Sequence, residues 1–117
     1  MSKHLIKARN EVNNFLNRFS SKSKIWGIVF INRGKNQETL KTLGITPKIR
    51  GEIINRIKDT DYIETIFDEV LHQELWVFGK DFNNHELYIK ISIGIENSST
   101  ICISFHIAEY KLEYAFR

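Results

Sequence analysis

The chain has 117 residues with one Cys, one Pro and a formal net charge of +3 at pH 7. Its length fits a single domain over residues 1–117, and 42% apolar with 26% charged residues is a globular rather than a disordered composition. No apolar run approaches the roughly 20 residues of a membrane span, and the first residues lack a signal-peptide layout, so we expect a cytoplasmic protein without a membrane partner.

The first predicted element is an amphipathic helix from Leu5 to Phe19. Apolar residues recur there at helical spacing, and polar residues fill the opposite face. The polar run Ser20–Ser23 is expected to end this helix, and the apolar run Ile25–Ile31 predicts a strand. A basic loop with a glycine turn follows at Asn32–Asn36.

Three further helices are expected before the pattern changes. The first is Gln37–Leu43, with Gly44 as its stop. The second begins with Thr46 as N-cap and Pro47 as first helical residue, and it buries a stripe of isoleucines. The third extends over residues 59–71, where apolar residues again recur at helical spacing.

From Glu74 onward the hydrophobic period is two, which predicts strands. They cover residues 74–80, 86–94 and 100–108, and short turns join them into an antiparallel meander. Helices followed by strands predict an α+β fold, in which N-terminal helices pack on one face of a C-terminal antiparallel sheet.

Side-chain parity divides the last two strands into an apolar and a polar face. The apolar face must meet the helices, because nothing else in the chain buries it; it comprises Leu87, Ile89, Ile91, Ile93, Ile101, Ile103, Phe105 and Ile107. The polar face carries Tyr88, Lys90, Ser104 and His106, and parity adds Cys102, which we expect to be a small packed residue. A phenol, an ammonium and an imidazole together can perform acid–base chemistry, but a one-sided antiparallel sheet normally has a polar face in any case.

The register of the preceding strand stays open. A two-residue turn after it puts Val77 and Gly79 on the polar face, whereas a longer turn or a bulge puts Trp76, Phe78 and Lys80 there instead. Because a lysine rarely lies in a core, we favour the second option and include Lys80 among the candidates for the site.

Other kinds of site have weaker signals. The four His and the single Cys show no metal-ligand spacing, so neither a metal nor another cofactor is expected. Residues 37–57 fit a helix-turn-helix with Arg50 on its basic second helix, which keeps a DNA-binding regulator as an alternative.

Charge is distributed unevenly along the chain. Residues 1–60 contain 13 Lys and Arg against 4 Asp and Glu, whereas residues 61–117 contain 4 against 10. Such an asymmetry indicates either a polyanion bound by the basic part or two solvated surfaces of opposite sign.

Several blocks of the sequence resemble the MqsR-like toxins of bacterial toxin–antitoxin systems. They follow the family's order over most of the chain: Glu38–Leu40, Leu43–Pro47, Leu75–Lys80, Tyr88–Ile91 and Cys102–His106. The resemblance implies a RelE-like fold and an endoribonuclease that cuts messenger RNA. It also implies a cognate antitoxin protein that neutralises the toxin, and it leaves open whether the ribosome takes part.

The resemblance further implies site residues. Tyr88 matches a tyrosine of the family's Tyr-x-Lys strand, and His106 stands where other members have lysine. The expected reaction is metal-independent attack of a ribose 2′-OH on the adjacent phosphate, which needs proton transfer and positive charge from the candidates His106, Tyr88, Lys90 and Lys80. The expected RNA-binding residues are Arg33, Lys35, Lys48, Arg50 and Arg117 on phosphates and Trp76 or Phe78 on bases.

Two further positions depart from the family pattern. Val77 stands where other members have glutamine, and Glu64 corresponds roughly to a lysine. A catalytically inactive toxin relative that still binds an antitoxin is therefore a second alternative.

Overall fold

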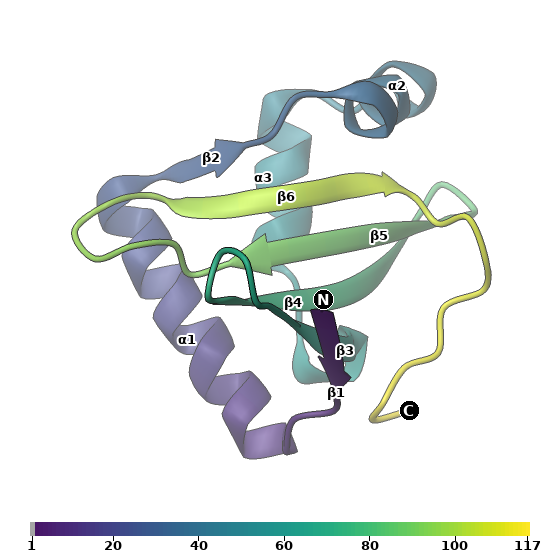
Figure 1. Ribbon diagram of the computed structural model, residues 1–117. Helices are drawn as coiled ribbons and strands as arrows, with labels where there is room; N and C mark the ends of the chain where they lie inside the picture. Colours follow the sequence, from purple (N-terminus) through teal and green to yellow (C-terminus); the bar gives the residue numbers. More distant parts are fainter. Residues whose placement is uncertain (1) are drawn as a thin grey trace.

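The computed structural model describes residues 2–117, which form an α+β fold of three helices and one six-stranded mixed sheet (Figure 1). The strands are β1 (Ser2–Leu5), β2 (Ile28–Phe30), β3 (Tyr62–Asp68), β4 (Gln73–Phe82), β5 (His85–Ser92) and β6 (Thr100–Ile107). The helices are α1 (Arg9–Trp26), α2 (Gly34–Leu43) and α3 (Pro47–Asn55), with a 3₁₀ turn, η1 (Asp59–Asp61), before β3. Across the sheet the order is β1-β3-β4-β5-β6-β2.

The α+β prediction is confirmed, but the expected segregation of helices and strands is wrong. β1 precedes α1, and β2 lies between α1 and α2. β2 is also parallel to β6, so the sheet is mixed rather than antiparallel. The length of α1 explains how β1 and β2 come to lie at opposite edges of the sheet. Its 18 residues extend about 27 Å, and six strands span about 24 Å. The helix therefore carries the chain from one edge of the sheet to the other.

The predicted helix over residues 59–71 is also wrong, because most of this segment is strand β3. β3 pairs with β1 on one side and with β4 on the other. A bulge between Tyr62 and Glu64 interrupts the alternation of its side chains. Tyr62 consequently packs in the core beneath the helices, and Ile66 packs on the other face of the sheet. Because both faces of β3 are buried, its apolar residues do not alternate, and their spacing in the sequence resembles that of a helix.

Helix α1 is present with different ends from those predicted. It begins at Arg9, because residues 2–5 pair with β3 instead, and it continues to Trp26 through the serine-rich stretch. Ser23 does not end the helix, because its hydroxyl hydrogen-bonds that of Thr100 at 2.7 Å and ties α1 to the start of β6. No helix within residues 2–117 is long and apolar enough to cross a membrane.

The local signals around α2 and α3 are confirmed. Gly44 caps the end of α2 in the left-handed conformation, with φ of 64°. The Thr46 hydroxyl accepts a hydrogen bond from the backbone N–H of Ile49 at 3.2 Å, and Pro47 is the first residue of α3. α2 begins at Gly34, so the end of the expected basic loop is helical.

The main core lies between the sheet and the helices α1 and α3, which are behind the strands in Figure 1. The rings of Phe15 and Trp76 stack there at 4.3 Å with an interplanar angle of 6°. Trp76 and Phe78 are buried in this core together with Ile89, Ile91 and Phe105. The opposite face of the sheet, called the open face below, carries the candidate site.

Candidate functional site

The turn between β4 and β5 determines which residues of β4 reach the open face. Asn83 and Asn84 form a two-residue turn in which both have positive φ, 47° and 64°. This turn pairs Gly79 with Tyr88 and Val77 with Lys90. The first of the two registers considered from the sequence is therefore the one observed.

Tyr88, Lys90, Ser104 and His106 lie together on the open face. Tyr88 is directly opposite His106 on β6, and their rings stack at 5.1 Å with an interplanar angle of 14°. Lys90 is opposite Ser104, and its Nζ lies 6.0 Å from the centre of the Tyr88 ring. The group that parity predicts is thus contiguous in space.

A bulge in β6 changes the parity of its first half. Lys90 pairs with Ser104 but the next residue, Ile91, pairs with Cys102, so Ile103 is an extra residue. Ile103 therefore packs with Tyr88 on the open face, and Cys102 is buried in the main core. The expected faces of these two residues were reversed, although Cys102 is a small packed residue as predicted.

Burial changes the acid–base properties of two site residues. It raises the pKa of Tyr88 to about 12, with a smaller contribution from Tyr110. It lowers the pKa of Lys90 from the usual 10.5, and the nearby guanidinium of Arg33 adds to this effect. Tyr88 is therefore a neutral hydrogen-bond donor at ordinary pH, and Lys90 releases its proton more readily than an exposed lysine.

The tautomer of His106 follows from its hydrogen bond. Its Nδ1 lies 2.9 Å from the backbone oxygen of Ile107. Because a carbonyl oxygen only accepts, Nδ1 is the donor, and Nε2 of the neutral ring has a free lone pair. His106 can accept a proton at this nitrogen.

Helix α2 is fixed beside the site by side chains that replace a neighbouring strand. Beyond β2, the outer edge of β6 is hydrogen-bonded by two buried residues, Asn36 and Thr39. Asn36 accepts from the N–H of Phe105 and donates to the oxygen of Ile103, both at 3.0 Å, and Thr39 accepts from the N–H of Ile107 at 3.0 Å. This attachment holds the first turn of α2, with its cations, next to Ser104.

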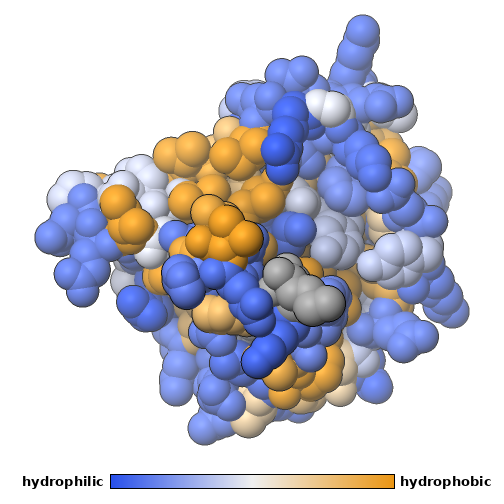
Figure 2. Space-filling model, in the orientation of Figure 1, coloured by the Kyte–Doolittle hydropathy of each residue, from blue (hydrophilic) through white to orange (hydrophobic). Residues whose placement is uncertain are grey.

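Three hollows adjoin along β6 and α2. The first, of about 300 Å³, lies between Arg33, Lys35 and Ser104. The second, of about 220 Å³, is lined by Tyr88, Lys90, Ser104, His106, Glu109 and Tyr110. The third, of about 380 Å³, lies between α2 and His106, where Lys35 and Glu109 form an ion pair at 2.6 Å. Figure 2 shows hydrophilic side chains over the α2 side of this face.

Three predicted residues of β4 lie on the other face. Trp76 and Phe78 fill the core, 6% and 0% exposed, so neither presents a ring to a ligand. Lys80 is paired with Asp61 at 2.8 Å and donates to the oxygen of Arg56. The favoured register was therefore wrong, because Lys80 does not need the open face: it reaches a buried carboxylate at the margin of the core.

Three predicted RNA-binding cations also lie away from the site. Arg117 binds Asp61 at 2.9 Å. The guanidinium of Arg50 lies 3.6 Å from the centre of the Phe30 ring, on the helix side of the sheet. Lys48 is exposed on α3. Only Arg33 and Lys35 of the predicted phosphate contacts border the open-face hollows.

Sequence reasoning missed Glu109 and Tyr110. Both line the hollow with Tyr88 and His106, but they lie after β6, where no periodicity indicates a direction for a side chain. The C-terminal segment is held to the sheet by Glu86, which accepts from the N–H of Leu112 and the hydroxyl of Tyr114. In the sequence, Glu86 on a strand and the tyrosines of the C-terminal segment are the features that could have indicated this contact.

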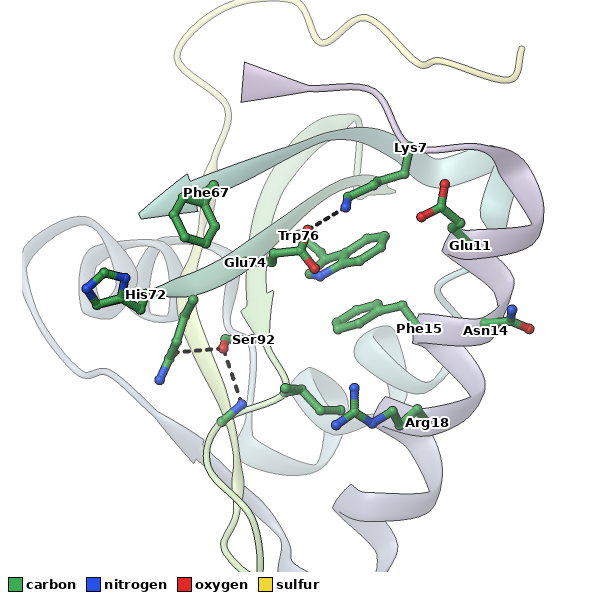
Figure 3. A pocket seen from close by; sticks show the side chains of 13 residues that line it. Lys7, Glu11, Asn14, Phe15, Arg18, Phe67, His72, Glu74, Trp76 and Ser92 are labelled. Carbon is green, nitrogen blue, oxygen red and sulfur yellow. Dashed lines mark hydrogen bonds and ion pairs between the residues drawn. The ribbon is translucent and has the colours of Figure 1, made fainter. Parts of the chain in front are cut away.

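A larger hollow, of about 640 Å³, is on the helix side, between α1 and the ends of β3, β4 and β5 (Figure 3). Its cations differ in their surroundings. Lys7 forms an ion pair with Glu74 and lies 5.8 Å from the Trp76 ring centre, whereas Arg18 is exposed at the other end. The cations Lys7 and Arg18 are balanced there by Glu11 and Glu74, and none of the residues predicted for catalysis lines this hollow.

No family model matches this chain, and no curated protein or solved structure shows significant similarity to it. Within residues 2–117, no three His, Cys, Asp or Glu side chains are grouped as metal ligands.

Proposed function

We propose that this protein is an endoribonuclease with a RelE-like arrangement that acts as the toxin of a toxin–antitoxin system. The observation that carries the proposal is the Tyr88–His106 stack beside Lys90, on facing strands and next to the cations of α2. The resemblance of the same sequence blocks to MqsR-like toxins supports it independently of the geometry.

The proposed reaction is a transesterification at phosphorus within the RNA. The ribose 2′-oxygen forms a bond to the adjacent phosphorus while the bond from phosphorus to the 5′-oxygen breaks. Nε2 of His106 takes the 2′-OH proton, since its Nδ1 is already a donor to Ile107. Lys90 gives a proton to the departing 5′-oxygen, a task for which its lowered pKa suits it. The products are a 2′,3′-cyclic phosphate and a 5′-hydroxyl.

Charge develops on the phosphate during this reaction and needs fixed donors. The neutral Tyr88 hydroxyl supplies one hydrogen bond, and Arg33 supplies positive charge close to Lys90. Lys35 holds a neighbouring phosphate in exchange for its exposed partner Glu109. Every proton transfer and every contact with a phosphate in the proposed reaction is thus assigned to a side chain of the protein.

The test is cleavage of single-stranded RNA by the purified protein in the presence of EDTA. We expect cleavage by the wild type, a loss of about 10²- to 10⁴-fold in His106→Ala, and a smaller loss in Tyr88→Phe. Lys48→Ala removes an exposed cation from α3 and serves as the matched control, with wild-type activity expected. Equal background cleavage by the wild type and His106→Ala would refute the proposed endoribonuclease activity.

Expression in growing cells tests the toxin role with the same variants. Growth arrest by the wild type but not by His106→Ala is expected, and co-expression of the antitoxin should restore growth. Arrest by both would assign toxicity to something other than RNA cleavage. Antitoxin binding without cleavage would support the alternative of an inactive relative.

A further inference from the structure

Tyr110 is the aromatic side chain that is accessible at the open-face site. It is 65% exposed and lines the same hollow as Tyr88, Lys90 and His106. The ring of Tyr88 is already stacked on His106, and Trp76 and Phe78 are buried on the other side of the sheet. Within the described part of the chain, no ring packs against Tyr110.

The backbone on both sides of Tyr110 is anchored to one residue of β5. The N–H of Ala108 donates to the backbone oxygen of Glu86 at 2.8 Å, and the N–H of Leu112 donates to the Glu86 carboxylate at 3.1 Å. Leu112 is also buried, only 3% exposed. The backbone at Tyr110 is therefore held in place while the side chain stays exposed. A ligand can bind the ring with little loss of backbone conformational entropy.

Charges around Tyr110 indicate what kind of ligand fits. Lys90 and Glu109 line the hollow, and Glu109 is neutralised by its ion pair with Lys35. Arg33 and Lys35 line the adjoining hollow that shares Ser104. An aromatic face beside a row of cations is how proteins hold single-stranded nucleic acid: the backbone follows the charges and an unpaired base stacks on the ring. A base inside a duplex does not offer its face in this way.

From this arrangement we infer that Tyr110 stacks an unpaired base of the RNA next to the reacting phosphate. The inference rests on the proposed function for its ligand and adds a residue that positions the substrate. Every base has a face that can stack, so this contact selects unpaired RNA rather than a sequence.

The test measures binding separately from cleavage. The probe is a short fluorescein-labelled single-stranded RNA with 2′-O-methyl groups, which lacks the attacking hydroxyl, and fluorescence anisotropy gives Kd. We expect Tyr110→Ala to raise Kd about 5- to 100-fold, while Tyr110→Phe and Tyr110→Trp bind like the wild type. Trp26→Ala, which removes an exposed aromatic at the end of α1, is the matched control and should leave Kd unchanged.

An abasic probe locates the stacked base. Removing one base should weaken binding to the wild type at one position and have no further effect there in Tyr110→Ala, because both changes remove the same contact. Three results would overturn the inference: unchanged Kd in Tyr110→Ala, an equal loss in Tyr110→Phe, or equally Tyr110-dependent binding of a duplex.

Cleavage of unmodified RNA by the same preparations separates the two proposals. If the wild type binds RNA through Tyr110 without cutting it, the enzyme proposal fails and the stacking stands. If the wild type cuts RNA and Tyr110→Ala binds and cuts equally well, the stacking alone fails. Absence of RNA binding by the wild type would overturn both.

Discussion

Tyr88 and Lys90 show how burial divides chemical tasks between neighbouring residues. Both are half-buried by the sheet and by the segments that border it. Loss of water disfavours the charged form of each, which keeps the phenol neutral and makes the ammonium a better acid. The same physical effect therefore produces a hydrogen-bond donor and a proton donor 6.0 Å apart, measured from Lys90 Nζ to the Tyr88 ring centre.

Asp59 gives a prediction about stability at the same scale. Hydrogen bonds from Arg9 and then from Asn13 lower its pKa to about 2 from 3.8. Because the folded pKa lies below the unfolded one, this carboxylate stabilises the fold above pH 3.8, and the contribution is lost as the pH falls through 2. We expect Asp59→Asn to have a lower free energy of unfolding than the wild type at neutral pH, with the difference shrinking toward pH 2, measured by urea denaturation.

The control for Asp59 is Glu96→Gln, in the exposed loop between β5 and β6. It should follow the wild type over the whole pH range. A difference between Asp59→Asn and the wild type that is as large at pH 2 as at neutral pH would contradict the linkage.

At the level of elements, the attachment of α2 to β6 connects the fold to the site. β2 covers only the first half of β6, and Asn36 and Thr39 satisfy the backbone of the second half. The short edge strand thus leaves room for a helix, whose first turn brings Arg33 and Lys35 to the open face.

Removing Asn36 tests this attachment. Asn36→Ala leaves the buried N–H of Phe105 and the oxygen of Ile103 without their partner, and we expect a loss of about 1–3 kcal/mol in the free energy of unfolding. Urea denaturation measures it. Gln37→Ala, exposed on the same helix, should change stability by no more than about 0.5 kcal/mol. Equal effects of the two substitutions would show that the edge contacts contribute nothing.

At the scale of the whole molecule, a buried carboxylate ties the C-terminal segment to the middle of the chain. Asp61, 3% exposed, accepts from Lys80 of β4 and from Arg117 near the C-terminus. The C-terminal segment also stacks Phe116 on Tyr62, at 5.6 Å between ring centres. Lys80 therefore belongs to the ion-pair cluster that anchors the C-terminal segment.

Lys80→Met separates this structural role from catalysis. We expect a loss of about 2 kcal/mol in the free energy of unfolding, because a charged hydrogen bond to a buried carboxylate is removed. Cleavage of RNA per folded molecule should remain that of the wild type. Lys111→Met, exposed on the C-terminal segment, is the matched control for both measurements. Lost cleavage in a folded Lys80→Met protein would return Lys80 to the catalytic group.

The folded molecule distributes its charges differently from the sequence. The basic N-terminal half supplies Arg33 and Lys35 to the open face, but Arg50 is stacked on Phe30 on the other side. On β3, Glu64 and Asp68 contribute negative charge near Lys90. A sequence count of charges therefore overstates how much of the basic half is available to a polyanion.

Much of the site was accessible from the sequence because it depends on local geometry. Alternation along a strand is a property of the backbone, so Tyr88 with Lys90 and Ser104 with His106 were assigned to the same faces without a fold. The caps at Gly44 and Thr46 were likewise predictable, because glycine tolerates positive φ and threonine offers a hydroxyl to a helix start.

The sequence alone thus determined the presence of three helices and of the strands β2, β4, β5 and β6, the α+β class, and the meeting of Tyr88, Lys90 and His106. Only the tertiary structure decided the partners of β1 and β2, the strand character of β3, the bulge at Ile103 and the face of Lys80. These features depend on pairing between segments far apart in the chain, and a shift of one residue reverses a strand's faces. The energy that selects one register comes from the packed core as a whole, which no local pattern contains.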